Sequence, residues 1–244
     1  MRRGQRAEER QRAYQADKAL RLAGAMGPAT LNLASYAATV KARIESVRPI
    51  EPHARVLEVG SGAHGLIFFL GLDDAIGVDP LADLYPSLFP EWQRRAKTLR
   101  AYGEALPFGD ASFDLVLSDN VIDHAESPSA VLSEIVRVLR PGGTLYFTVN
   151  VHHVVYALAS HLHTAWNAAG VRYEIGTFSD HTVHFTLREV RARIRALPLR
   201  VLTEDTGIQR AKEEAMKRGG RNPRDVLKRL FFKNARFEII AVRT

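Results

Sequence analysis

Apolar and polar positions alternate along the middle of this chain in a pattern that predicts strands and helices in turn. Short apolar runs typical of buried strands occupy residues 55–59, 75–79, 97–102, 113–119 and 144–150. An amphipathic helix is predicted over 129–140, where Pro141, Gly142 and Gly143 end it. Strands that alternate with helical segments favour an α/β fold with a parallel sheet in a doubly wound layer structure.

The flanks of this core carry weaker patterns. Residues 1–24 are polar and arginine-rich and predict a surface helix, and a second helix is predicted over 31–47, capped by Thr30. After residue 150 the alternation loosens. There we expect a helix at 154–170, a short extended piece at 181–186, a helix at 187–197, strands at 199–205 and 237–243, and one or two basic helices between these last strands.

These patterns suggest two parts. We expect an N-terminal helical extension over residues 1–50 and one globular domain over residues 51–244. Cap elements are expected within 151–186 and 206–230, and both basic ends of the chain are expected to lie beside the pocket that these caps cover.

Composition excludes several classes of protein. The 244 residues contain no cysteine, which excludes structural disulfides and thiolate metal sites and fits a reducing compartment. No apolar run reaches the roughly 18 residues that cross a bilayer. No apolar segment follows the basic N-terminus, so we expect no secretory signal and a cytoplasmic location.

Charge is unevenly spread along the chain. Residues 1–55 carry eleven Lys and Arg against five Asp and Glu, and residues 187–244 carry sixteen against seven. Residues 56–186 carry seven basic and fifteen acidic side chains. The basic ends either form solvated helix faces or attract an anionic substrate, a nucleic acid or a membrane surface.

A glycine-rich turn follows the first strand of the core. Gly60, Gly62 and Gly65 have the G-x-G-x-x-G spacing, which allows a tight turn and a close approach of the backbone to a ligand. Asp79 ends the next strand and suits a ribose hydroxyl acceptor in both dinucleotide and nucleoside sites. These features alone leave the cofactor open.

The segment that follows decides between a dinucleotide and a nucleoside cofactor. The phrases EVGSG at 58–62, EALPF at 104–108, SFD at 112–114 and RVLRPGG at 137–143 stand in the order typical of one family. With Asp110 between them, they closely resemble the class I S-adenosylmethionine-dependent methyltransferases of the methyltransferase type 11 group. The resemblance covers about residues 55–150, and the flanks carry no recognisable motif.

The resemblance implies a Rossmann-like, seven-stranded sheet of order 3-2-1-4-5-7-6 with the last strand antiparallel. It also implies S-adenosylmethionine as the cofactor. An acid beside the turn, Glu58, would repel a pyrophosphate but favours the cationic sulfonium. The implied cofactor-binding residues are Glu58, Gly60, Ser61, Gly62, Asp79, Pro80, Glu104, Ala105 and Asn120, with Asp79 on the ribose and Glu104 on the adenine amino group.

Methyl transfer to a hydroxyl requires a proton acceptor. His124 lies just after the fourth strand and is the candidate catalytic base, while Asp123 beside it is not assumed to pair with it. His152, His153 and His181 are candidates for the wall of the acceptor pocket. The histidine spacing matches no compact ligand motif, so we expect no metal site.

We therefore expect a methyltransferase enzyme that acts on a small-molecule acceptor, possibly an anionic one, at oxygen. One alternative is a methyltransferase of RNA or another polyanion, which the basic ends suggest. The other is a non-catalytic S-adenosylmethionine-binding protein. The sequence names neither the acceptor nor its nucleophilic atom, and it gives no oligomeric state.

Overall fold

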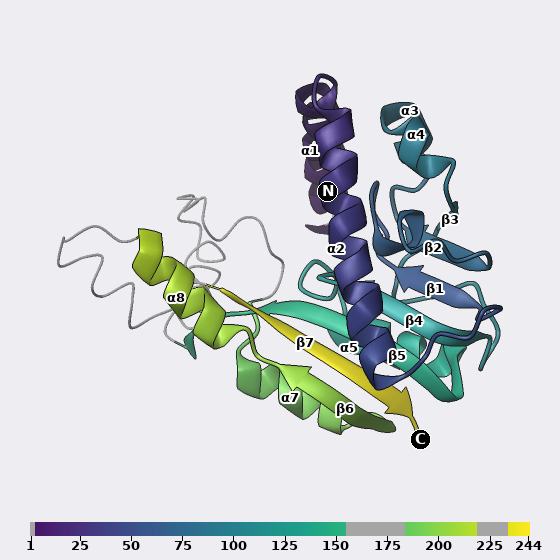
Figure 1. The fold of residues 1–244 in the computed structure, drawn as a ribbon, viewed down its shortest axis with the longest axis vertical. Helices are drawn as coiled ribbons and strands as arrows, with labels where there is room; N and C mark the ends of the chain where they lie inside the picture. The colour runs from purple at the N-terminus through teal and green to yellow at the C-terminus, as the bar shows by residue number, and fades with distance from the viewer. Residues whose placement is uncertain (1–2, 155–183, 219–233) are drawn as a thin grey trace.

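Figure 1 shows the computed structural model of the chain, which describes residues 3–154, 184–218 and 234–244. Its elements in chain order are α1 (Arg3–Leu22), α2 (Met26–Val47), β1 (Val56–Val59), the 3₁₀ helix η1 (Leu66–Phe68), β2 (Ala75–Asp79), α3 (Tyr85–Leu88), α4 (Pro90–Gln93), β3 (Lys97–Arg100), β4 (Phe113–Asp119), α5 (Pro128–Val138), β5 (Leu139–Val151), α7 (Leu187–Arg195), β6 (Leu199–Asp205), α8 (Ile208–Arg218) and β7 (Ala235–Arg243).

The strands form one sheet in the order β3-β2-β1-β4-β5-β7-β6. Neighbouring strands from β3 to β5 are parallel. Strand β7 lies between β5 and β6 and is antiparallel to both. The order and the single reversed strand confirm the fold expected from the sequence.

Helices cover the two faces of the sheet. On one face α5 and α7 share a core with the strands, and on the other α2 and η1 do so. Figure 1 shows α2 crossing in front of the central strands. Its buried positions Ala37, Val40 and Ile44 recur at helical spacing, which places them on one stripe facing the sheet.

Helix α2 begins earlier than the sequence predicts. It starts at Met26, so Thr30 lies inside the helix and caps nothing. Pro28 is tolerated because the first turn of a helix has no partner for its amide groups. The Thr30 hydroxyl instead accepts a hydrogen bond of 2.9 Å from Trp92 Nε1, which ties α2 to α4.

The junction of α5 and β5 also differs from the prediction. The helix ends at Val138 rather than 140, and β5 begins at Leu139 and runs through Pro141–Gly143. The residue before a proline is pushed out of the helical region, which favours an early helix end. Most other strand bounds agree with the sequence, while the helix expected at 154–170 lies almost wholly outside the described residues.

Arg137 of α5 holds the loop that precedes β4. Its guanidinium donates to the carbonyl oxygens of Leu106 at 3.1 Å and Phe108 at 2.7 Å, and to Asp110 Oδ1 at 2.8 Å. It also binds Glu134 one turn earlier, which lowers the pKa of that carboxyl. Asp110, expected to be a turn residue, is therefore one of several anchors for this loop.

Replacing Arg137 by alanine should destabilise the fold. Two carbonyl groups and two carboxylates lose their donor, and we expect the free energy of unfolding to fall by about 2 kcal/mol. The control is Arg140→Ala, because Arg140 makes an ion pair with Asp114 and its side chain is half-exposed. That variant should lose about 0–1 kcal/mol. Urea denaturation of both variants measures this, and equal losses would contradict the anchoring role.

Glu58 fixes the turn between β1 and η1. Its side chain is 1% exposed, and its carboxylate accepts hydrogen bonds from the amides of Leu66 at 2.9 Å and Ile67 at 3.0 Å. A Cβ atom on Gly65 would lie 2.3 Å from Glu58 Oε2, so only glycine leaves room for this contact. Burial raises the pKa of Glu58 to about 8, more than the two amide hydrogen bonds lower it.

This raised pKa predicts a pH-dependent stability. The folded state holds the proton of Glu58 more tightly than the unfolded state, so stability should fall as pH rises from about 4.5 to about 8. The loss is at most about 1.4 kcal/mol per pH unit. Glu58→Gln removes the titrating group; its NH2 cannot accept the second amide hydrogen bond, but that loss does not depend on pH. The stability of the wild type relative to Glu58→Gln should therefore decrease across this window, and a constant difference would show an ordinary pKa.

Candidate active site

The sheet order brings three strand ends together. Strand β1 lies between β2 and β4, and all three run parallel, so their carboxyl ends meet at one edge. Gly60, Asp79 and Asn120 stand at or just after these ends. In open α/β sheets this edge is where ligands bind.

The glycine turn is held by β2. The amides of Gly60 and Ser61 donate to the Val78 carbonyl at 2.8 and 3.1 Å. Gly60 has a φ of +72°, and a Cβ atom there would lie 2.5 Å from a Val121 methyl carbon. Glycine is therefore required at position 60 by both conformation and space.

Gly62 presents a different surface. Its φ is +55°, and no described atom lies within 4 Å of a Cβ atom built on it. Its amide donates to Asp79 Oδ2 at 3.1 Å. The turn is therefore open above Gly62, directly beside the carboxylate that ends β2.

Asp79 is surrounded by donors. Its Oδ1 accepts from the amide of Leu81 at 2.8 Å and from the Tyr85 hydroxyl at 2.9 Å. Burial raises the pKa of Asp79, and these hydrogen bonds act in the opposite direction. A ligand hydroxyl at this carboxylate would have to compete with the hydroxyl of Tyr85. Pro80, the next residue in the chain, is half-buried.

Ser61 carries a buried hydroxyl. Its Oγ has no hydrogen-bond partner among the residues that the structure describes. A Cβ atom on Gly77 would lie 2.5 Å from this oxygen, so the glycine in β2 makes room for the serine. The hydroxyl is thus enclosed between the turn and β2, and Ser61 can face the open side of the site only through its backbone.

Three other predicted cofactor residues have protein partners. Glu104 Oε1 accepts from the amides of Glu126 at 3.0 Å and Ser127 at 3.2 Å, before α5. The Ala105 amide donates to the Tyr102 carbonyl within a turn. Glu58 lies beneath the glycine turn and binds its amides, so its side chain does not face the open side of the site.

Asn120 joins the ends of β4 and β5. It has a φ of +59°, its amide donates to the Thr148 carbonyl at 3.1 Å, and its Oδ1 accepts from the Asn150 amide at 3.1 Å. These contacts fix the backbone at the end of β4. Its side chain is therefore already engaged by the chain itself.

His124 follows in the loop after β4. Its side chain is 48% exposed, and its Nε2 lies 3.9 Å from Oδ1 of Asp123, whose side chain is fully buried. The adjacent residues, whose pairing was not assumed from the sequence, are therefore close in space. This places an accessible imidazole next to a fixed carboxylate.

The predicted acceptor histidines lie after β5. His152 is buried, its amide donates to the Phe185 carbonyl at 2.7 Å, and its ring centroid lies 4.8 Å from that of His184. His153 is half-buried. His181 lies outside the described residues. The structure therefore pairs His152 with a histidine that the sequence did not single out.

Helix α1 lies beside the glycine turn. Lys18 contacts Nε2 of His64, and burial together with Lys18 lowers the pKa of His64 to about 4. Ala19 and Leu22 pack against a cluster that includes Ala63 of the turn. The first helix therefore lies beside the glycine turn, and its expected place beside the acceptor pocket stays a prediction.

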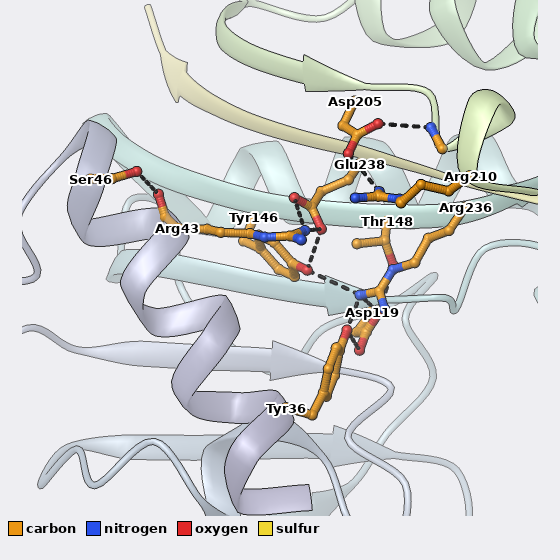
Figure 2. A network of polar contacts seen from close by, with 11 residues as sticks. Tyr36, Arg43, Ser46, Asp119, Tyr146, Thr148, Asp205, Arg210, Arg236 and Glu238 are labelled. Atoms are coloured by element: carbon orange, nitrogen blue, oxygen red, sulfur yellow. Dashed lines mark hydrogen bonds and ion pairs between the residues drawn. The ribbon is translucent and has the colours of Figure 1, made fainter. Parts of the chain in front are cut away.

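A polar network that the sequence did not predict lies at the end of β4 (Figure 2). Asp119 accepts from the Thr148 hydroxyl at 2.6 Å, the Tyr36 hydroxyl at 2.8 Å and Arg236 Nη2 at 2.8 Å. The Arg236 guanidinium also stacks over the Tyr36 ring. Burial raises the pKa of Asp119 to about 6, and nearby Glu238 adds to the rise.

The network continues along β7 to Glu238. Arg43 Nη1 of α2 lies 2.8 Å from both carboxylate oxygens of Glu238, and the Tyr146 hydroxyl donates to Oε2 at 2.9 Å. Arg236 donates to the Tyr146 oxygen at 3.0 Å and so connects the two acids. The i, i+2 spacing of Arg236 and Glu238 was a signal that both lie on one face of a strand.

Within the described ranges, no helix is long and apolar enough to cross a membrane.

Comparison with known proteins agrees with this geometry. A family model described as a methyltransferase domain matches residues 57–147. A protein of Mycolicibacterium gilvum named an uncharacterized methyltransferase is 38% identical over 101 residues, which are 39% of each chain. The chain thus spans about two fifths of the length of such curated relatives.

Solved structures share the fold at low identity. Geranyl diphosphate C-methyltransferase from Streptomyces coelicolor, solved with Mg²⁺, geranyl diphosphate and S-adenosylhomocysteine, has a TM-score of 0.59 and 14% identity, covering 82% of this chain and 76% of that one. The cyclase SpnF has a TM-score of 0.55 and 17% identity, covering 84% and 80%. Residues 57–147 are thus similar to the methyltransferase domain that this family model describes, and the sheet order agrees with that likeness.

Proposed function

We propose that this protein transfers the methyl group of S-adenosylmethionine to an oxygen atom of a small-molecule acceptor. The observation that carries the proposal is the acid at the end of β2, which lies beside the open glycine turn. Asp79 faces Gly62, and no described atom blocks the space above that glycine. A carboxylate in this place suits the hydroxyls of a ribose.

The residues present fit this cofactor. S-adenosylmethionine supplies a methyl group on a positively charged sulfur, which makes that carbon open to attack. The open backbone at Gly62 offers room for a polar ligand beside Asp79. The residues proposed to hold the cofactor are Gly60, Ser61, Gly62, Asp79, Pro80, Glu104, Ala105 and Asn120.

Glu58 has a different part in this proposal from the one that the sequence suggested. Its carboxylate is buried under the turn and bound to two amides. It therefore acts on the cofactor through the shape of the turn rather than by direct contact with the sulfonium. Removing it should alter the turn first and the affinity as a consequence.

His124 is the proposed proton acceptor. A hydroxyl that attacks the methyl carbon must give up its proton, and a neutral imidazole can take it near neutral pH. The ring is accessible, and the buried carboxylate of Asp123 lies 3.9 Å from its Nε2. His152, His153 and His181 remain proposed acceptor-side residues.

The division of the chain is also part of the proposal. The proposed division is a helical extension over residues 1–50 and a catalytic domain over residues 51–244, with cap elements within 151–186 and 206–230, of which 155–183 and 219–230 lie outside the described residues. Support comes from α8, which lies in the second of these segments and contacts β7 beside the Asp119 network. A fold shared with a cyclase does not fix the reaction, so activity must be measured.

The cofactor is tested by calorimetry. The wild type should bind S-adenosylmethionine and S-adenosylhomocysteine, and NAD should give no heat. Asp79→Ala should weaken S-adenosylhomocysteine binding by about 1–3 kcal/mol, because a charged hydrogen-bond acceptor is lost. Tyr85→Phe is the matched control, since it removes the phenol that contacts Asp79 but keeps the carboxylate. Tight NAD binding without S-adenosylhomocysteine binding would overturn the proposal.

The role of His124 is tested by kinetics once a turned-over acceptor is known from a panel screened by mass spectrometry. His124→Ala should lower kcat by about 10²–10⁴-fold while S-adenosylhomocysteine affinity is kept. The acidic limb of the pH–rate profile should also disappear. His53→Ala, an exposed histidine before β1, controls for loss of an imidazole as such. A variant that keeps most of its kcat would show that another group takes the proton.

A further inference from the structure

A groove lies between α2 and α8 beside the Asp119 network. It has a volume of about 380 Å³, which suits a small molecule. Strands β5 and β7 supply its floor, and Arg236 and Glu238 on that floor belong to the network of Figure 2. The helix residues along its two walls are Tyr36, Thr39, Val40 and Arg43 on one side and Arg210, Ala211 and Glu214 on the other.

Each wall is one face of a helix. The α2 positions follow the spacing i, i+3, i+4, i+7, and Gly207 with the α8 positions follows the same spacing. Two helix faces therefore line the groove from opposite sides. All of these residues lie in the part of the chain that the structure describes.

Three guanidinium groups from three elements lie around the groove. The side chains of Arg43, Arg210 and Arg236 are 41%, 55% and 36% exposed. Each is bound to an acid: Glu238, the partner of Arg43, is 10% exposed, Asp119, the partner of Arg236, is 20% exposed, and Asp205, the partner of Arg210, is 45% exposed. Arg43 and Arg236 therefore lie above acids that are more deeply placed, whereas Asp205 beside Arg210 is half-exposed and Glu214 on the wall of α8 is exposed.

The acids and arginines of the groove also differ in how many of their hydrogen-bonding atoms already have partners. Glu238 accepts from Arg43 and Tyr146, and Asp119 accepts from three donors. Among described partners, Arg236 donates only through Nη2, and its buried Nε has no partner. A guanidinium has five N–H donors, so donors remain where the acceptors are largely taken.

The groove adjoins the site of the proposed reaction. Tyr36 and Arg236 contact Asp119 at the end of β4, and Asn150 on the floor donates to Asn120. One residue further, the Val121 side chain lies so near the glycine turn that a Cβ atom on Gly60 would be 2.5 Å from it. Only the short segment 119–121 therefore separates the groove from the cofactor side.

We propose that this groove binds an oxyanion of the methyl acceptor, a carboxylate or a phosphate, through Arg210 and Arg236. The inference rests on the proposed function and adds the chemical class of its substrate. Planar N–H forks match carboxylate and phosphate oxygens, which favours arginine for such groups. The acceptor is thus a small anion whose charged end lies between α8 and β7 while its hydroxyl points toward residue 120.

The test uses probes in place of the unidentified acceptor. The ¹⁵N-labelled wild type, saturated with S-adenosylhomocysteine, is titrated at constant ionic strength with inorganic phosphate, benzoate and neutral benzamide. NMR follows the arginine Nε–Hε signals. Phosphate or benzoate should give saturable shifts that include Arg236, benzamide should give none, and the probe that binds more tightly identifies the oxyanion.

Arg210→Glu should weaken binding of that probe by tenfold or more, since a charged hydrogen bond contributes about 1.5–3 kcal/mol. Lys212→Glu is the matched control. It makes the same change of charge on α8, about 200° around the helix from Arg210. Lys212→Glu should still bind the probe, with only the loss of affinity that the long-range electrostatic effect of a charge reversal causes in both variants. Arg210→Gln repeats the test without charge reversal.

Two results would overturn the inference: no saturable shift with either anion, or equal binding by Arg210→Glu and Lys212→Glu. Calorimetry with S-adenosylhomocysteine is carried out first on the wild type. If S-adenosylhomocysteine does not bind, the proposed function fails. If it binds but neither anion binds at the groove, the proposed function stands and only the substrate class is refuted.

Discussion

The packing of α2 against the sheet is the contact on which the rest of the molecule depends. Between β1 and β2 the chain offers this face only the single 3₁₀ turn of η1, which is too short to cover it. The apolar stripe of α2 takes that place and buries side chains of β4, β5 and β7. The same helix places Tyr36 against Asp119 at the end of β4 and Arg43 against Glu238 within β7. Packing of the apolar stripe of α2 on the sheet therefore also places Tyr36 and Arg43 in the polar network.

Buried acids mark the strand ends, and each is stabilised in its own way. Glu58 is held by amides, Asp79 by amides and a phenol, and Asp119 by two hydroxyls and a guanidinium. These surroundings shift the pKa of each of the three carboxyl groups. Burial raises the pKa of Glu58 to about 8 and that of Asp119 to about 6, and the hydrogen bond from the Thr148 hydroxyl opposes the rise at Asp119. Acids a few residues from the same sheet edge thus hold their protons over different ranges of pH.

The sequence predicted the parts of this structure that local pattern controls. Strand positions, the glycine turn and the acid after β2 all follow from periodicity and from motifs within residues 55–150. The partners of Glu58 did not, because the contact requires the turn to fold back over its own strand. The Asp119 network was out of reach for another reason: Arg43 and Glu238 are 195 positions apart, and only the completed sheet brings them together. The start of α2 was misjudged because a proline in a first turn was read as a break.

The place of β7 in the sheet has a consequence for how this protein is made. Strand β6 has no neighbour until residues 235–243 pair with it, because β7 separates it from β5. During synthesis the ribosome therefore releases α7, β6 and α8 before the strand that joins them to the rest. Until then α2 can cover β1 and β4 but lacks the partner of Arg43. A nascent chain at that stage exposes an unpaired edge of β5, which is the surface that a chaperone would have to protect.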